Sequence, residues 1–207
     1  MGKVRYVIIG NSVAAVNCIE AIRGVDKVGD VTVVSDEEIH NYSRPLLSYY
    51  LGGRITEDKL PFRDKSFYEK QRVTLLLGAQ AERLDSAKKE VGLEDGTVLP
   101  YDRLLISVGG LPIIPSIKGF QDHIQGIFTF LKLRDAKVLM DYIEQNKLKD
   151  AVVLGAGLIG LKVIEGLQQR GLTTTVIELM DKILSNTFDK EASSLIEDKL
   201  SEHKCRV

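Results

Sequence analysis

Short apolar runs alternate with amphipathic stretches along the chain, which is the pattern of strands and helices in an α/β protein. The run at 4–9 is rich in Val and Ile and predicts a strand buried on both faces. Behind it, apolar residues recur at spacings of three and four and predict a helix with one buried stripe. That stripe consists of Ala15, Cys18, Ile19 and Ile22. Arg23 and Gly24 predict the end of this helix, because glycine adopts the left-handed conformation easily, and the next strand is predicted at 31–34.

The same order of elements occurs a second time in the second half of the chain. A strand is predicted at 151–154, a helix follows and is ended by Arg170 and Gly171, and another strand is predicted at 173–177. The apolar side of this helix consists of Ile159, Val163, Ile164 and Leu167. Both copies therefore read strand, turn, helix, strand and acid, which predicts two βαβ units of the Rossmann type.

A glycine-rich turn joins the first strand of each copy to its helix. The first glycine of such a turn permits the tight bend, the second lets the backbone approach a pyrophosphate, and the third allows close packing of the helix. Backbone N–H groups and the positive end of the helix dipole then meet the phosphates. The candidate nucleotide-binding residues are Gly10, Asn11, Ser12, Val13, Ala14 and Ala15 in the first turn, and Gly155, Gly157, Leu158, Ile159 and Gly160 in the second. Ser12 and Ala15 replace two glycines of the first copy. For either copy, a βαβ unit whose small residues only permit packing stays an alternative.

An acidic residue follows the second strand of each copy, where a carboxylate can accept hydrogen bonds from ribose hydroxyls. In the second copy this residue is Glu178. In the first copy Asp36 is the first choice and Glu37 the adjacent alternative, because the register of the strand does not separate them. Glu178 would repel a 2′-phosphate, and no arginine occurs at 179–182, so NADH is expected rather than NADPH.

The last part of the chain contains one more amphipathic pattern. It predicts a helix at about 190–203, and residues 204–207 look like the start of another strand. The residues expected to face the core from this helix are Ala192, Leu195, Ile196 and Leu200.

Composition and charge narrow the class of protein. Hydrophobic residues make up 44% and charged residues 28%, which supports a packed core and excludes wholesale disorder. The formal net charge of −1 gives no electrostatic case for nucleic acid or an anionic membrane surface. The longest apolar stretch, 151–161, is shorter than the about 20 residues of a membrane span. Cys18, Cys205 and the three histidines show neither zinc-ligand spacing nor a disulfide framework, so no metal is expected and a reducing, cytoplasmic setting is favoured.

The paired turns and three further stretches resemble the FAD-dependent pyridine nucleotide–disulfide oxidoreductase superfamily. The likeness is to its branch of rubredoxin reductases, NADH oxidases and the flavin portion of NADH-dependent nitrite reductases. The stretches are Tyr42–Ser48, Gly78–Ala81 and Ser107–Pro112. The resemblance implies an α/β fold of two Rossmann-like dinucleotide-binding domains (the FAD/NAD(P)-binding fold) with a β-meander between them, the second domain being truncated. It implies an FAD-binding domain at 1–114 and an incomplete NAD(H)-binding domain at 115–207.

The resemblance also implies further contacts with FAD. The residues concerned are Arg44, Pro45, Ala81, Ser107, Val108 and Gly109. Val108 stands where the family has threonine, so a side-chain hydroxyl contact is lost while the backbone contact is retained. Lys162 stands where many relatives have a glutamate near the flavin–nicotinamide contact, and a solvated helix lysine is the alternative interpretation. His40 lies near the flavin-side loop, where a packing or surface role is favoured.

Two departures from the family narrow the chemistry. The chain has no CxxxxC pair and no single cysteine near Pro45, and Cys18 lies on the predicted buried stripe. A thiol-based disulfide reductase or peroxidase is therefore excluded.

The implied reaction is hydride transfer from NADH to FAD, followed by electron transfer to an acceptor of the rubredoxin, nitrite or O₂ type. No side chain need act as acid or base in the first step, so no catalytic residue is named. A small electron-transfer protein is an expected partner, and a homodimer is expected for the full-length form. Because the family's chain continues to a Gly-Asp segment that completes the FAD site, the 207 residues are expected to be an N-terminal portion. The alternatives are a non-catalytic nucleotide-binding or scaffold module, favoured by Ser12 and Val108, and a subunit completed by a separate polypeptide.

Overall fold

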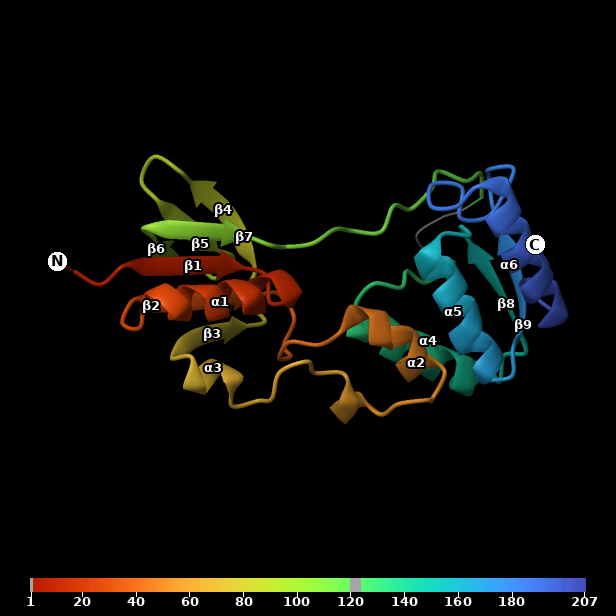
Figure 1. The fold of residues 1–207 in the computed structure, drawn as a ribbon, viewed down its shortest axis with the longest axis horizontal. Helices are drawn as coiled ribbons and strands as arrows, with labels where there is room; N and C mark the ends of the chain where they lie inside the picture. The colour runs from red at the N-terminus through yellow and green to blue at the C-terminus, as the bar shows by residue number, and fades with distance from the viewer. Residues whose placement is uncertain (1, 120–123) are drawn as a thin grey trace. The chain divides into compact units, whose positions relative to one another are not determined.

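The structure is a computed structural model that describes residues 2–119 and 124–207 (Figure 1). The chain forms two compact units that interleave in sequence. The first unit consists of the residues up to Ser43 together with Pro61–Gly110, and the second of Arg44–Leu60 together with Leu111–Val207. The segment Arg44–Leu60 thus packs in the second unit although it precedes half of the first unit in sequence. The functional boundary expected at residue 114 stays a prediction.

A four-stranded parallel sheet forms the centre of the first unit, in the order β3-β2-β1-β7 (Figure 1). Its strands are β1 (Arg5–Ile9), β2 (Asp30–Ser35), β3 (Val73–Leu77) and β7 (Arg103–Ile106). Ile9 at the end of β1 lies beside Val34 on one side and Ile106 on the other. Because all four strands are parallel, their carboxyl ends lie along one edge of the sheet, where open α/β sheets bind ligands.

Different elements cover the two faces of this sheet. On one face, Ile8, Val31 and Val33 pack against α1 (Val13–Val25) and α3 (Phe67–Lys70). On the other face, Val7 and Val34 pack against the β-meander, which consists of β4 (Ala81–Asp85), β5 (Glu90–Leu93) and β6 (Val98–Pro100). The alternation of side chains along β1 and β2 therefore divides the core into two layers.

The second unit is built around a pair of parallel strands, β8 (Asp150–Leu154) and β9 (Thr173–Ile177). Arg206 forms a single parallel bridge with Thr175, as expected for the start of another strand. The helical elements are η1 (Arg44–Leu46), α2 (Leu47–Leu51), η2 (Glu57–Lys59), α4 (Leu133–Asn146), α5 (Leu158–Gln169) and α6 (Lys190–Glu202). Leu51 of α2 is fully buried in a cluster with Ile143 of α4 and Leu167 of α5, which fixes α2 in this unit.

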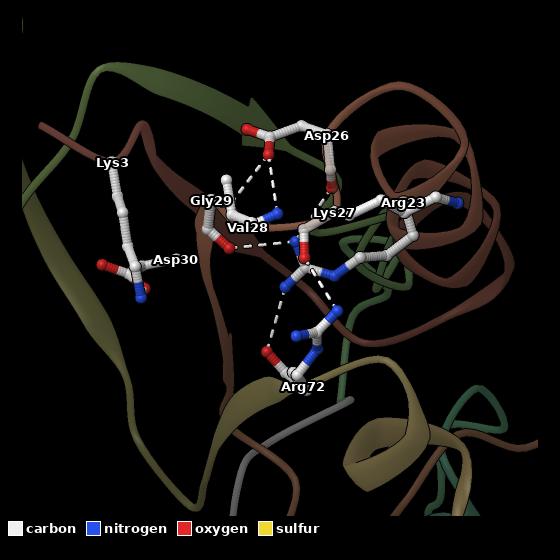
Figure 2. Close-up of polar contacts among 8 residues, drawn as sticks. All are labelled: Lys3, Arg23, Asp26, Lys27, Val28, Gly29, Asp30 and Arg72. Atoms are coloured by element: carbon white, nitrogen blue, oxygen red, sulfur yellow. Dashed lines mark hydrogen bonds and ion pairs between the residues drawn. The ribbon is translucent and has the colours of Figure 1, made fainter. Parts of the chain in front are cut away.

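The end of α1 differs from the sequence prediction, which placed it at Gly24. Gly24 has no positive φ, and the helix continues to Val25. Arg23 is buried, with 6% of its surface exposed, and its guanidinium donates to the carbonyl oxygens of Asp26, Gly29 and Arg72 at 2.9–3.2 Å (Figure 2). It also donates to the carbonyl oxygen of Gln71 at 2.6 Å. The carboxylate of Asp26 in turn accepts hydrogen bonds from the backbone of Val28 and Gly29 (Figure 2). These contacts, rather than a left-handed glycine, organise the loop after the helix.

One prediction of a buried residue is also wrong, and the buried side of α5 is shorter than its apolar side. Ile159 is 58% exposed, so the buried side of α5 consists of the later residues Val163, Ile164 and Leu167. Leu195 of α6 is exposed, and the buried position on this helix is Ser193, whose hydroxyl donates to the carbonyl of Ile183 at 2.8 Å. The predicted end of α5 is confirmed, because the helix stops at Gln169 and Gly171 has a φ of 83°.

Candidate functional site

The first glycine turn lies at the carboxyl edge of the parallel sheet, where three strands converge. Gly10 has a φ of 106°, and a Cβ atom added there would lie 2.2 Å from the carbonyl oxygen of Ser107. The Gly10 N–H donates to Val34 at 2.8 Å, and the Ser107 N–H donates to Ile9 at 2.7 Å. Only glycine combines this backbone conformation with this close approach. The turn thus joins the ends of β1, β2 and β7.

The amino terminus of α1 faces this edge without a side-chain cap. Ser12 is the N-cap residue, with an extended backbone, and its hydroxyl makes no capping hydrogen bond. The first N–H groups of a helix have no partner within the helix and carry the positive end of its dipole. Val13 and Ala14 are exposed, whereas Ala15 is completely buried. The residue at the third position of the turn therefore packs the helix, and the preceding residues present the N–H groups.

The acidic residues after β2 lie at the same edge. The carboxylate of Glu37 accepts a hydrogen bond of 2.8 Å from the hydroxyl of Tyr42. Asp36 is exposed. The backbone of this segment also anchors the chain after β3, since Gly78 N–H donates to the Glu37 carbonyl at 3.2 Å.

Most of the residues predicted to bind FAD lie at the carboxyl edge of the four-stranded parallel sheet. The glycine turn, the two acids, Ala81 at the start of β4 and Ser107–Gly109 after β7 all follow the carboxyl ends of parallel strands. Val108 is 62% exposed. Arg44 and Pro45 are different, because they belong to the second unit. There the guanidinium of Arg44 donates to the carbonyl of Leu131 at 2.9 Å.

The second glycine turn gives each of its glycines a distinct environment. Gly155 has a φ of 97°, and its N–H donates to Ile177 at 2.8 Å. A Cβ atom at Gly160 would lie 2.0 Å from the carbonyl oxygen of Gly155, so this glycine lets α5 pack on the turn. Gly157 differs from both. Its φ of −80° suits any residue, and an added Cβ atom would have no neighbour within 4 Å. Leu158 and Ile159 beside it are 60% and 58% exposed.

Glu178 binds the backbone around this turn. One carboxylate oxygen accepts a hydrogen bond of 2.8 Å from the N–H of Ala156, and the other accepts from Leu179 at 2.8 Å and Met180 at 3.0 Å. These hydrogen bonds, chiefly those from Met180 and Ala156, hold the pKa of Glu178 below its usual value. An open hollow of about 400 Å³ lies beside it at the end of β9. The second unit thus presents an ionised acid and an open glycine at one edge.

Lys162 is paired, which the sequence did not reveal. Its ammonium group forms an ion pair with Glu165, one turn further along α5, and lies 4.4 Å from the ring centroid of Tyr49. Glu165 also pairs with Arg54 at 2.9 Å. Burial lowers the pKa of Lys162, but the hydrogen bond and charge of Glu165 outweigh this and raise it. The i, i+3 spacing of Lys162 and Glu165 was the available signal, whereas the contact with Tyr49 depends on tertiary packing.

A polar cluster behind the first turn was missed as well. Tyr68 of α3 donates a hydrogen bond to the side chain of Asn11, and its ring stacks on His40 with the centroids 5.6 Å apart. No local sequence pattern joins these residues, because Asn11 and Tyr68 are 57 positions apart.

The remaining cysteine and metal-ligating residues that the structure describes are not gathered into a site. Cys18 is half-buried, and burial raises the pKa of its thiol, which disfavours the thiolate. Within the described ranges, no cluster of three or more His, Cys, Asp or Glu residues could hold a metal ion. Among the helices of those ranges, none is long and apolar enough to cross a membrane.

Comparison with known proteins gives consistent relatives. Residues 4–207 match the family described as pyridine nucleotide-disulphide oxidoreductase. The chain is 34% identical over 193 residues to the NADH-dependent phenylglyoxylate dehydrogenase subunit epsilon of Aromatoleum evansii, covering 93% of this chain and 45% of that protein. It is 30% identical over 201 residues to the NAD(P)H nitrite reductase of Bacillus subtilis, covering 97% of this chain and 24% of that protein.

A solved structure agrees closely in fold. The NAD-dependent persulfide reductase from A. fulgidus superposes with a TM-score of 0.90 at 31% identity, over 98% of this chain and 38% of that chain. The chain thus spans less than half the length of each of these relatives.

Proposed function

Because the chain belongs to the pyridine nucleotide-disulphide oxidoreductase family, we propose that its two glycine turns bind the two nucleotides of an NADH-dependent flavin oxidoreductase. FAD and NAD(P)H are the cofactors of this family. FAD is assigned to the turn at Gly10–Ala15 and NADH to the turn at Gly155–Gly160. The FAD/NAD(P)-binding fold of two Rossmann-like units, the second of which is built around the strand pair β8 and β9, supports this assignment.

Gly157 is the observation that carries the proposal. Neither its backbone conformation nor the packing of the protein requires glycine at this position. A pyrophosphate that approaches the backbone N–H groups would favour glycine there, because a Cβ atom crowds its approach. Ser12, the equivalent N-cap residue of the first turn, is small enough to be accommodated. Gly157 therefore supports a dinucleotide at the second turn over a unit whose small residues only permit packing.

The acids divide the ribose contacts between the two sites. At the first site, Asp36 is the first choice for the ribose and Glu37, whose carboxylate accepts a hydrogen bond from Tyr42, is the adjacent alternative. At the second site, the ionised Glu178 disfavours a 2′-phosphate, and the ammonium of Lys182 donates to the carbonyl of Phe188. NADH is therefore favoured over NADPH.

Bound FAD would supply the redox chemistry, by taking hydride from NADH and passing electrons to an acceptor. The chain itself contributes N–H groups for the phosphates and acids for the riboses, and no acid or base catalyst is required for this step. The relatives are named for acceptors as different as nitrite and persulfide, so the acceptor varies among proteins of this fold. A small electron-transfer protein as acceptor and a homodimer of the full-length protein belong to the same proposal.

Variants that weaken the binding of one nucleotide and not the other test the assignment of FAD to the first turn and NADH to the second. Calorimetry should show that Asp36→Asn weakens FAD binding by about tenfold and leaves NADH binding within about twofold, while Glu37→Gln changes FAD binding less. Glu178→Gln should weaken NADH binding and leave FAD binding unchanged. A wild-type chain that binds NADH but takes up no FAD would favour a nucleotide-binding module without flavin chemistry. A chain that binds neither would contradict the proposal.

A further inference from the structure

The buried hydroxyl of Tyr68 in α3 connects two polar side chains, those of Asn41 and Asn11. The residue is 4% exposed, and its ring lies between His40, on which it stacks, and Phe67, whose ring it meets edge-on with the centroids 5.2 Å apart. Its hydroxyl accepts a hydrogen bond of 3.2 Å from Asn41 Nδ2 and donates one of 2.5 Å to Asn11 Oδ1. Burial raises the pKa of Tyr68, so the hydroxyl keeps its proton.

The direction of these hydrogen bonds follows from the backbone. Asn41 is completely buried, and its Oδ1 accepts from the N–H of Arg63 at 3.0 Å. Its amide nitrogen must therefore face Tyr68 as the donor. Because a tyrosine hydroxyl has a single proton, that proton is available only for Asn11. The chain of donors runs from Arg63 through Asn41 and Tyr68 to Asn11.

Asn11 shows the effect of this arrangement. Its Nδ2 atom is buried and has no hydrogen-bond partner among the residues that the structure describes. A buried donor without a partner costs free energy. We therefore attribute the orientation of the Asn11 carboxamide to the hydrogen bond that its oxygen accepts from Tyr68. Asn11 is the second residue of the first glycine turn, directly before the uncapped N-cap residue Ser12.

We propose that Tyr68 is a positioning residue of the first nucleotide site, which acts by holding Asn11 and thereby the N–H groups at 11–14 in the orientation that phosphate binding requires. The inference rests on the proposed function for the identity of the nucleotide, but the fixation of the turn does not. Preorganised donors bind an anion more tightly, because less ordering remains to be done on binding.

The matched pair Tyr68→Phe and Tyr6→Phe tests this role. Both remove one hydroxyl from the first unit. The hydroxyl of Tyr6 donates to Asp26 at 3.1 Å, at the C-cap of α1 and thus at the opposite end of this helix from the first glycine turn. Tyr68→Phe keeps the ring between His40 and Phe67. Asn11→Ala removes the acceptor and serves as the second route to the same loss.

Two readouts separate positioning from stability. In the ligand-free chain, the ¹⁵N order parameters at 11–14 should fall from about 0.85 to below about 0.6 in Tyr68→Phe and Asn11→Ala, and stay at the wild-type value in Tyr6→Phe. FAD binding should weaken about tenfold in Tyr68→Phe and in Asn11→Ala. In the Asn11→Ala background, Tyr68→Phe should weaken FAD binding no further.

Wild-type order parameters at 11–14 in Tyr68→Phe would overturn the inference, even if its melting temperature falls. Additive effects of Tyr68→Phe and Asn11→Ala on FAD binding would overturn it as well. A wild-type chain without FAD affinity would contradict the proposed function, while the order parameters would still decide whether Tyr68 holds the turn.

Discussion

Two glycines of the second turn give opposite expectations when alanine replaces them. At Gly157 the added methyl group enters open space with a suitable φ of −80°. The free energy of unfolding should stay within about 0.5 kcal/mol of the wild-type value, because the lower entropy of the unfolded chain offsets the poorer N-cap preference of alanine. At Gly160 the methyl group would lie 2.0 Å from the Gly155 carbonyl oxygen, and the backbone must shift. Overpacking of this kind costs about 1–3 kcal/mol, and helix propensity offsets at most about 1 kcal/mol.

Urea denaturation and NADH calorimetry separate the two effects. Gly157→Ala should keep the denaturation midpoint and weaken NADH binding at least about tenfold, or about 1.4 kcal/mol, because the methyl group occupies the approach of the pyrophosphate. Gly160→Ala should lower the midpoint. The reasoning is refuted by a Gly157→Ala variant that loses more than about 1 kcal/mol of stability or binds NADH as tightly as the wild type.

Three further expectations concern stability. Arg23→Met should lower the free energy of unfolding, measured in urea, by at least about 3 kcal/mol, because four carbonyls lose a charged donor. Arg23→Lys should recover less than half of this loss. A loss below about 1 kcal/mol in Arg23→Met would contradict the structural role of Arg23. The depressed pKa of Glu178 gives stability that is complete above the ordinary value of 4.5 and is lost as the pH falls through the folded-state pKa. Glu178→Gln should therefore reduce the loss of stability on acidification. An unchanged dependence of stability on acidic pH would contradict this role of Glu178. Glu165→Gln should lower the free energy of unfolding by less than about 1 kcal/mol, since the side chains of Lys162, Glu165 and Arg54 are 37–54% exposed. A larger loss in thermal unfolding would contradict a weak contribution of these ion pairs.

The features that sequence predicted well are local ones. The two strand–turn–helix–strand units were predictable because glycine spacing, apolar runs and the terminal acids all lie within about 30 residues. Gly171 ends its helix as predicted, since a left-handed glycine is a property of the local backbone.

The features that sequence did not predict depend on distant contacts. Gly24 fails to end α1 because Arg23 binds carbonyls 48 and 49 residues away. Arg44 lies in the second unit because α2, which follows it, is anchored by the fully buried Leu51 in a cluster with Ile143 and Leu167. The hydroxyl of Tyr68 has a functional interpretation only once Asn11 is seen to lie against it.

An anaerobic spectral titration tests the central claim most directly. The purified chain is incubated with FAD, separated from free flavin, and titrated with NADH while the flavin absorbance is recorded. A yellow protein whose flavin band bleaches on addition of NADH is expected, with Gly157→Ala requiring about tenfold more NADH. A wild-type chain that retains no flavin, or a bound flavin that stays oxidised in excess NADH, would contradict the claim that the two turns bind the FAD and NADH of a flavin oxidoreductase.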